Sequence, residues 1–355
     1  MTAGRGAHKI APEMPRIHYL SGYLPALFLA SIAMAQSPPD TEPLEEVVVA
    51  GEFPGPGMWK VTRADDPAGH VLWIVGDPPP LPKRMKWKSR DVERVASSAQ
   101  EILLDASANM EPDEKIGLFK GLSLLPVALK ARKNPDDATL QSQVPADVYQ
   151  RWLVQKKRFL GSDSGVEKWR PLFAAAKLRK EAFDDLGLRE SGMVWEVVEK
   201  IAKKHKIKTT TPSLKFTFPA DGLKAKIKEF SHQPLADIEC FATTLDLTEA
   251  LSDTATEERR ARAWATADLA TLGTLPPLPN AFLPCAMALL ATDFAKQVIP
   301  ADIRAQLHAL WIESASKSLA ANQTTLAIVP LAKLTRDGGY LEMLRAKGYL
   351  IEVPK

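Results

Sequence analysis

Residues typical of β-strands lie near both ends of the chain, with a long helical stretch between them. Residues 58–63 (MWKVTR) and 70–75 (HVLWIV) are rich in β-branched and aromatic side chains, and the ADDPAG segment that joins them suits a sharp turn. Residues 324–331 (TTLAIVPL) and 349–353 (YLIEV) repeat the strand pattern. Because a lone strand is unstable, we expect the two ends to pair in one small mixed sheet.

The region between these strands predicts mainly helices. From Ser89 to about Pro300, apolar residues recur at steps of three and four, and the tryptophans in these stripes are expected in the core. Two β-prone runs, 101–106 (EILLDA) and 206–211 (KIKTTT), interrupt the pattern. The fold class is therefore α/β (α+β), with a small mixed sheet from the N- and C-terminal segments and a large, predominantly helical middle region. A chain of 355 residues allows one large domain or two intimate halves.

The first 35 residues resemble a secretory signal. Lys9 and Arg16 precede an apolar run, and the small-x-small pattern ending at Ala35 predicts cleavage before Gln36. The run is short for a membrane span, so no stable span is expected after cleavage. The alternative is an N-terminal membrane anchor, and either Met1 or Met14 could be the true start.

The chain that remains after the predicted cleavage is expected to have two parts. Residues 36–57 are rich in Pro, Gly and Glu and are expected to form a flexible leader, followed by one domain over residues 58–355. The mature protein is expected to be periplasmic or secreted.

Charge argues against one class of partner. The whole chain has a formal net charge of +3, and loss of Arg5, Lys9, Arg16 and Glu13 with the signal lowers it to +1. A nearly neutral protein lacks the basic excess of nucleic-acid binders, so no nucleic-acid partner is expected.

The two cysteines remain after the predicted cleavage. Cys240 and Cys285 would reach an oxidising compartment, where a disulfide between them is the economical interpretation. The alternative is two buried free thiols. The chain has no CxxC motif, which argues against a redox or zinc role.

Several stretches together resemble the TraB/GumN family over Met58 to Val353. They are GMWKV, HVLWIVG, the helical middle and the terminal LAIVPLAKLTRDGGYLEMLRAKGYLIEV. The resemblance implies a fold shared with Tiki-type proteases and with erythromycin-esterase-like and ChaN-like proteins. Active members are thought to use two Gly-x-x-His elements and an acidic residue, which hold a divalent metal or act directly in hydrolysis.

Both Gly-x-x-His motifs are degenerate in this chain. In the first, Gly76 matches the glycine, Asp77 takes the usual threonine position and Pro79 stands in place of histidine. In the second, Lys333 replaces the histidine. The acidic position becomes Asp105. Proline offers no side-chain ligand, and an ammonium group repels a metal cation.

These replacements lead to a specific hypothesis about the vestigial site. A carboxylate left without its metal needs another partner, so we expect Lys333 to pair with Asp77 or Asp105. The resemblance then implies a catalytically inactive protein that needs no cofactor and serves as a binding or interaction module in the periplasm or cell envelope. Its partner would be an envelope protein or a polysaccharide. The alternative is a metal-dependent hydrolase or protease with a rebuilt site that holds a divalent metal.

The remaining polar candidates have simpler interpretations. His70 is expected to be solvent-exposed, His205 to lie at a helix end, and His232 and His308 to be surface or capping residues. None shows a metal-ligand spacing, and no HExxH or GxSxG motif is present. The resemblance also suggests a family arginine at Arg304.

Overall fold

The computed structural model describes residues 55–78 and 80–354. Its strands are β1 Met58–Arg63, β2 Val71–Asp77, β3 Leu81–Pro82, β4 Glu101–Leu104, β5 Ser107–Pro112, β6 Leu188–Arg189, β7 Lys208–Thr210, β8 Ser213–Phe218, β9 Thr324–Pro330 and β10 Tyr349–Glu352. Its α-helices are α1 Arg90–Ser98, α2 Leu118–Ala131, α3 Leu140–Gln143, α4 Ala146–Phe159, α5 Pro171–Asp185, α6 Met193–His205, α7 Leu223–Phe230, α8 Ile238–Leu251, α9 Thr254–Ala265, α10 Leu269–Thr274, α11 Phe282–Leu290, α12 Asp293–Val298, α13 Ile303–Ala321, α14 Leu331–Thr335 and α15 Tyr340–Ala346. Short 3-10 helices lie at Pro135–Asp137 and Gly165–Lys168.

Some predictions concern residues outside these segments. The signal over 1–35, its cleavage site at Ala35 and Gln36, and the leader as far as residue 54 are not among the described residues, and neither is Pro79. Among the helices of the described segments, none is both long and apolar enough to cross a membrane.

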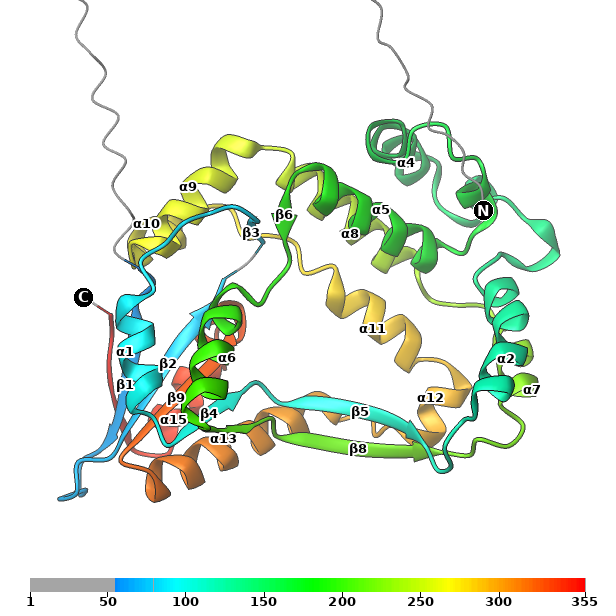
Figure 1. The fold of residues 1–355 in the computed structure, drawn as a ribbon. Helices are drawn as coiled ribbons and strands as arrows, with labels where there is room; N and C mark the ends of the chain where they lie inside the picture. Colours follow the sequence, from blue (N-terminus) through cyan, green and yellow to red (C-terminus); the bar gives the residue numbers. More distant parts are fainter. Residues whose placement is uncertain (1–54, 79, 355) are drawn as a thin grey trace, which may run out of the picture. The chain divides into compact units, whose positions relative to one another are not determined.

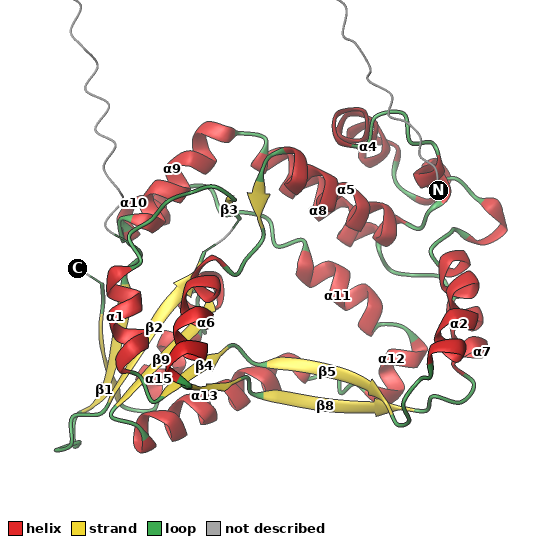
Figure 2. Ribbon diagram, in the orientation of Figure 1, coloured by secondary structure: helices red, strands yellow, loops and turns green. Residues whose placement is uncertain are grey.

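The predicted sheet is present and contains strands from both ends of the chain. Its strand order is β10-β1-β2-β9-β4-β7 (Figures 1 and 2). β1 pairs antiparallel with β10 and β2, whereas β2, β9, β4 and β7 pair in parallel. The sheet is therefore mixed, as expected, and the two β-prone runs of the middle region complete one side of it.

Helices cover both faces of this sheet. On one face, Leu72, Ile74 and Val329 pack with Trp311 of α13 and Leu344 of α15. On the other face, the alternate residues of the same strands pack against α1, α6 and α9, in a cluster that includes Val75, Ile328, Val95, Val198 and Trp264. Burial on both sides explains why β2 and β9 have nearly continuous apolar sequences.

A second apolar core lies in the helical middle region. Trp152 of α4 packs on Phe241 of α8, with ring centroids 5.2 Å apart. In the same region Cys240 of α8 and Cys285 of α11 form the predicted disulfide, with an S–S distance of 1.97 Å. The bond joins two helices that are separated in the chain by α9 and α10.

The sequence analysis missed two pairs of strands, the short pair β3–β6 and the longer pair β5–β8. β5 and β8 form a separate parallel two-stranded sheet with the register Ser107↔Ser213 to Pro112↔Phe218. β8 (SLKFTF) alternates apolar and polar residues, but β5 (SANMEP) carries no strand signal of its own. β5 is therefore a strand because it pairs with β8. The sequence analysis was wrong to place residues 107–112 in the helical middle region.

The prediction for His70 was also wrong. Its Nδ1 lies 3.0 Å from Asp66 Oδ2, and only 21% of its side chain is exposed. Asp66 also accepts from the backbone N–H groups of Ala68 and His70, so the carboxylate organises the β1–β2 turn and holds the imidazole against it.

Candidate functional site

The carboxyl ends of three parallel strands bring the predicted site residues to one edge of the sheet. Asp77 ends β2 and pairs in register with Pro330, the last residue of β9. Asp105 directly follows β4, and Lys333 lies in α14, which follows β9 without a loop. This edge is where α/β sheets commonly carry their functional groups.

Lys333 makes an ion pair with Asp105. The distance from Lys333 Nζ to Asp105 Oδ2 is 2.6 Å, with 35% and 21% of the two side chains exposed. Of the two carboxylates considered from the sequence, Asp105 is thus the partner. The ammonium group neutralises the carboxylate at the strand edge where the family resemblance implies a metal.

Tyr340 occupies the other oxygen of the same carboxylate. Its hydroxyl donates to Asp105 Oδ1 at 2.7 Å, and the backbone N–H of Ala106 also donates to this oxygen at 2.9 Å. The ring is buried and stacks on Trp311, with centroids 4.0 Å apart. Burial and the neighbouring Asp105 charge raise the pKa of Tyr340 well above its usual range, so the hydroxyl stays protonated and remains a donor.

Sequence analysis missed Tyr340 as a site residue. It belongs to the terminal helix motif DGGYLEMLRAKG, whose apolar pattern explains a buried aromatic ring without any polar role. A buried tyrosine hydroxyl needs a hydrogen-bond partner, and only this general requirement could have suggested a polar role for Tyr340.

His308 and Arg336 lie beside this cluster. An Arg336 nitrogen, Nη2, donates to His308 Nε2 at 2.8 Å, and the imidazole meets the Tyr340 ring edge-on at a centroid distance of 5.5 Å. Burial, followed by the charges of Arg336, Lys333 and Arg304, lowers the pKa of His308. The imidazole is therefore neutral at physiological pH and accepts a proton only with difficulty.

His308 is half-buried, and its contacts are with Arg336 and Tyr340 rather than with a helix end of its own. Arg304 influences His308 through its charge, from one turn earlier in α13. His232 fits the capping interpretation, since its Nδ1 lies 2.8 Å from the Lys228 carbonyl oxygen.

Asp77 has a different environment from Asp105. Its Oδ2 accepts from the backbone N–H of Gly192 at 2.9 Å, while its Oδ1 is buried without a hydrogen-bond partner. Burial raises the pKa of Asp77, against the opposing effects of hydrogen bonds from Gly192 and Val194 and of the Arg189 charge. Asp77 thus anchors the N-terminus of α6 to the end of β2.

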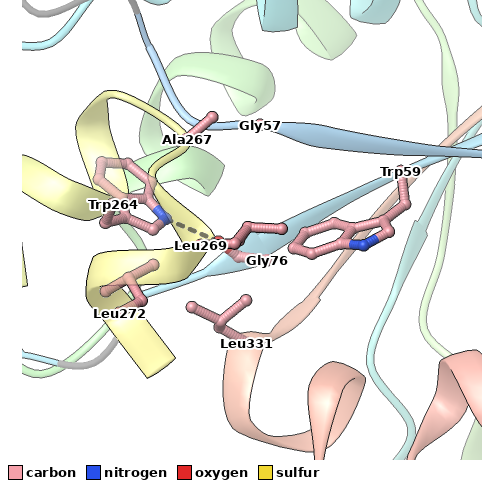
Figure 3. A pocket seen from close by; sticks show the side chains of 8 residues that line it. All are labelled: Gly57, Trp59, Gly76, Trp264, Ala267, Leu269, Leu272 and Leu331. Carbon is pink, nitrogen blue, oxygen red and sulfur yellow. Dashed lines mark hydrogen bonds between the residues drawn. The ribbon is translucent and has the colours of Figure 1, made fainter. Parts of the chain in front are cut away.

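Gly76 is required by close packing. A Cβ at this position would lie 2.6 Å from Leu331 Cδ1 and 3.3 Å from Leu331 Cα. The Gly76 carbonyl accepts from Trp264 Nε1 at 3.0 Å (Figure 3). Both contacts fix the strand end between α9 and α14.

A small apolar pocket opens beside this strand end (Figure 3). The residues that line it are Gly57, Trp59, Gly76, Trp264, Ala267, Leu269, Leu272 and Leu331. Its lining offers no carboxylate, imidazole or thiol, so the chemistry of the pocket differs from that of the neighbouring ion pair.

The donor set at the sheet edge does not fit a divalent metal. Both oxygens of Asp105 have protein partners, Asp77 has only its buried Oδ1 without a partner, and a lysine ammonium has no lone pair to donate. Across residues 55–78 and 80–354, no group of three or more His, Cys, Asp or Glu side chains is arranged to hold a metal ion.

Residues 57–353 match the model of the TraB/PrgY/gumN family. The chain belongs to this family. The match covers β1 to the last strand, so the sheet, the helical middle region and α14 with Lys333 are all parts of a TraB/PrgY/gumN domain. No curated protein and no solved structure matches the chain.

Proposed function

We propose that this TraB/PrgY/gumN protein is exported and catalytically inactive, and that it serves as a binding or interaction module in the periplasm or cell envelope. The observation that supports loss of catalysis is the Lys333–Asp105 ion pair. When the chain is aligned with the family's second Gly-x-x-His element, Lys333 stands where the family has histidine. Its ammonium group pairs with Asp105, the acidic residue of the site.

The hydrogen bonds around Asp105 support the same proposal. A carboxylate that accepts from Lys333 and Tyr340 has both oxygens engaged, so binding a metal or activating water would require breaking a charge-assisted hydrogen bond. The raised pKa of Tyr340 also keeps its hydroxyl protonated, so no phenolate forms to act as a base. The ligand class stays open between an envelope protein and a polysaccharide.

Export is supported by features elsewhere in the chain. The charged and apolar pattern of residues 1–35 is typical of a secretory signal. The Cys240–Cys285 disulfide is compatible with an oxidising compartment. Cell fractionation together with N-terminal sequencing of the purified protein tests this part, and we expect an envelope protein that begins at Gln36.

Metal analysis and peptidase assays test the loss of catalysis. We expect the purified wild-type protein to carry no stoichiometric manganese, zinc or iron, and its background peptidase activity to be unchanged by Asp105→Ala. The control variant Lys333→His restores an imidazole at one element while Pro79 still occupies the other. Stoichiometric metal in the wild type, or activity abolished by Asp105→Ala, would favour a metal-dependent hydrolase with a rebuilt site.

A further inference from the structure

Helix α2 exposes an apolar surface that the core does not use. Leu118, Leu122, Leu125 and Leu129 are 75%, 57%, 54% and 45% exposed, and Phe119 beside them is 87% exposed. The steps of four, three and four residues place the leucines on one side of the helix. We call these five side chains the α2 stripe. An exposed apolar surface of this kind marks an interaction site.

The stripe belongs to a pair of helices at the far end of the β5–β8 strand pair. β5 and β8 pair in parallel and lead directly into α2 and α7, which pack on each other (Figure 1). The less exposed residues Leu124, Val127 and Ala131 lie on the side of α2 opposite the stripe. The face of α2 that packs in the fold is therefore distinct from the stripe.

Basic residues accompany the stripe. Together α2 and α7 contain five lysines and a single acidic residue, namely Lys120, Lys130, Lys224, Lys226, Lys228 and Glu229. Lys120 pairs with Asp221, just before α7, at 3.2 Å, which leaves four lysines for an external anion. α2 itself has no acidic residue. An apolar face combined with lysines is the composition of helices that lie in the interface of a membrane with anionic headgroups.

Charge also disfavours a second copy of this chain as the occupant. A second copy would bring another lysine-rich helix pair rather than the negative charge that complements this one. A membrane surface with anionic lipid suits both the apolar stripe and the lysines. The leucines can pack among acyl chains, and the ammonium groups can pair with phosphate groups.

We propose that the α2 stripe inserts into the surface of a membrane that contains anionic phospholipid, with the lysines of α2 and α7 at the level of the headgroups. The β5–β8 strand pair would then connect the membrane-bound helices to the sheet that carries the Lys333 site (Figure 1). This inference concerns a surface remote from the Lys333–Asp105 pair and is independent of whether the site is catalytic.

Vesicle flotation tests the proposal with the full chain. Wild-type protein should float with phosphatidylglycerol-containing vesicles and less with pure phosphatidylcholine, and added salt should weaken binding. The variant Phe119→Gln/Leu122→Gln should lose about tenfold or more in partition coefficient, because each apolar side chain contributes on this scale when buried in lipid. A matched control, Leu350→Gln/Val353→Gln, alters residues of similar exposure (53% and 57%) at the opposite end of the fold and should bind like wild type.

A local probe separates α2 from the apolar N-terminal run. A Leu125→Cys variant carrying an environment-sensitive fluorophore should show a blue shift and an intensity increase on anionic vesicles, whereas the same label at Lys317→Cys, on an exposed position of α13, should not. An unchanged Leu125 label, or equal flotation of wild type and stripe variant, would overturn the proposal. It would equally fail if the stripe substitutions abolished a dimer in light scattering without affecting vesicle binding.

Discussion

Lys333 Nζ lies 2.6 Å from Asp105 Oδ2, although the two residues are 228 positions apart in the chain. The contact exists because β4 and β9 are parallel neighbours, so the residues that follow them emerge at the same edge. The Lys333 cation, in the short helix after β9, thus compensates the carboxylate that directly follows β4. Loss of one partner would leave the other part-buried and uncompensated.

Replacement of Lys333 by Met should lower the free energy of unfolding by about 1–2 kcal/mol, because Asp105 loses its cation in a partly shielded site. The cost is below that of a fully buried pair, since the lysine side chain is 35% exposed. Urea denaturation measures the effect. Lys333→Arg should stay close to wild type, and Asp105→Asn should be less harmful in the Lys333→Met background than alone. Additive effects of the two substitutions would show that the pair contributes no coupling.

Asp77 should make stability depend on pH. Because burial raises its pKa, the folded chain holds this proton more tightly than the unfolded chain. The stabilisation that results is complete below the unfolded carboxyl pKa of about 3.9 and is lost as pH rises through the higher folded pKa. Wild type should therefore lose stability relative to Asp77→Asn as the pH rises from about 4 towards neutrality.

Denaturation at a series of pH values checks this prediction. Asp77→Ala separates charge from hydrogen bonding, because it leaves the Gly192 N–H without its acceptor and should be about 1–2 kcal/mol less stable than Asp77→Asn at every pH. Parallel pH profiles for wild type and Asp77→Asn would contradict the proposed burial of charge.

A methyl group at position 76 should destabilise the strand end. Gly76→Ala places a Cβ 2.6 Å from Leu331 Cδ1, and overpacking of this kind costs about 1–3 kcal/mol. The penalty should shrink when Leu331→Ala removes the nearest atom. Gly117→Ala is a matched control, since no atom lies within 4 Å of its Cβ position. Thermal denaturation of the four variants and wild type decides whether the contact is the cause.

The disulfide should contribute about 2–4 kcal/mol, because it closes a long loop in the unfolded chain. The bridged cysteines are separated by 45 positions. The Cys240→Ala/Cys285→Ala variant should unfold at lower urea concentration than wild type, and a reducing agent should shift only the wild-type curve. Alkylation of both cysteines in unreduced, unfolded protein would show that they are free thiols.

The sequence alone was sufficient for the elements whose signals are local. The β1–β2 hairpin, the terminal strand–helix–strand unit and α6 follow from turn residues, alternation and helical periodicity within short windows. The disulfide could be predicted because the chain has only two cysteines. Strand pairing between the chain ends was also predictable, since neither end can form a stable sheet by itself.

Only the tertiary structure decided which side chains meet. Asp105 rather than Asp77 pairs with Lys333, and Tyr340 reaches Asp105 from 235 positions away. The β5 strand forms because β8 lies beside it, and α2 exposes its leucines because α7 covers a different face. Local sequence patterns show the spacing at which buried residues recur along a helix or strand. The partner of a polar group or of an apolar face is determined by packing between segments far apart in the chain.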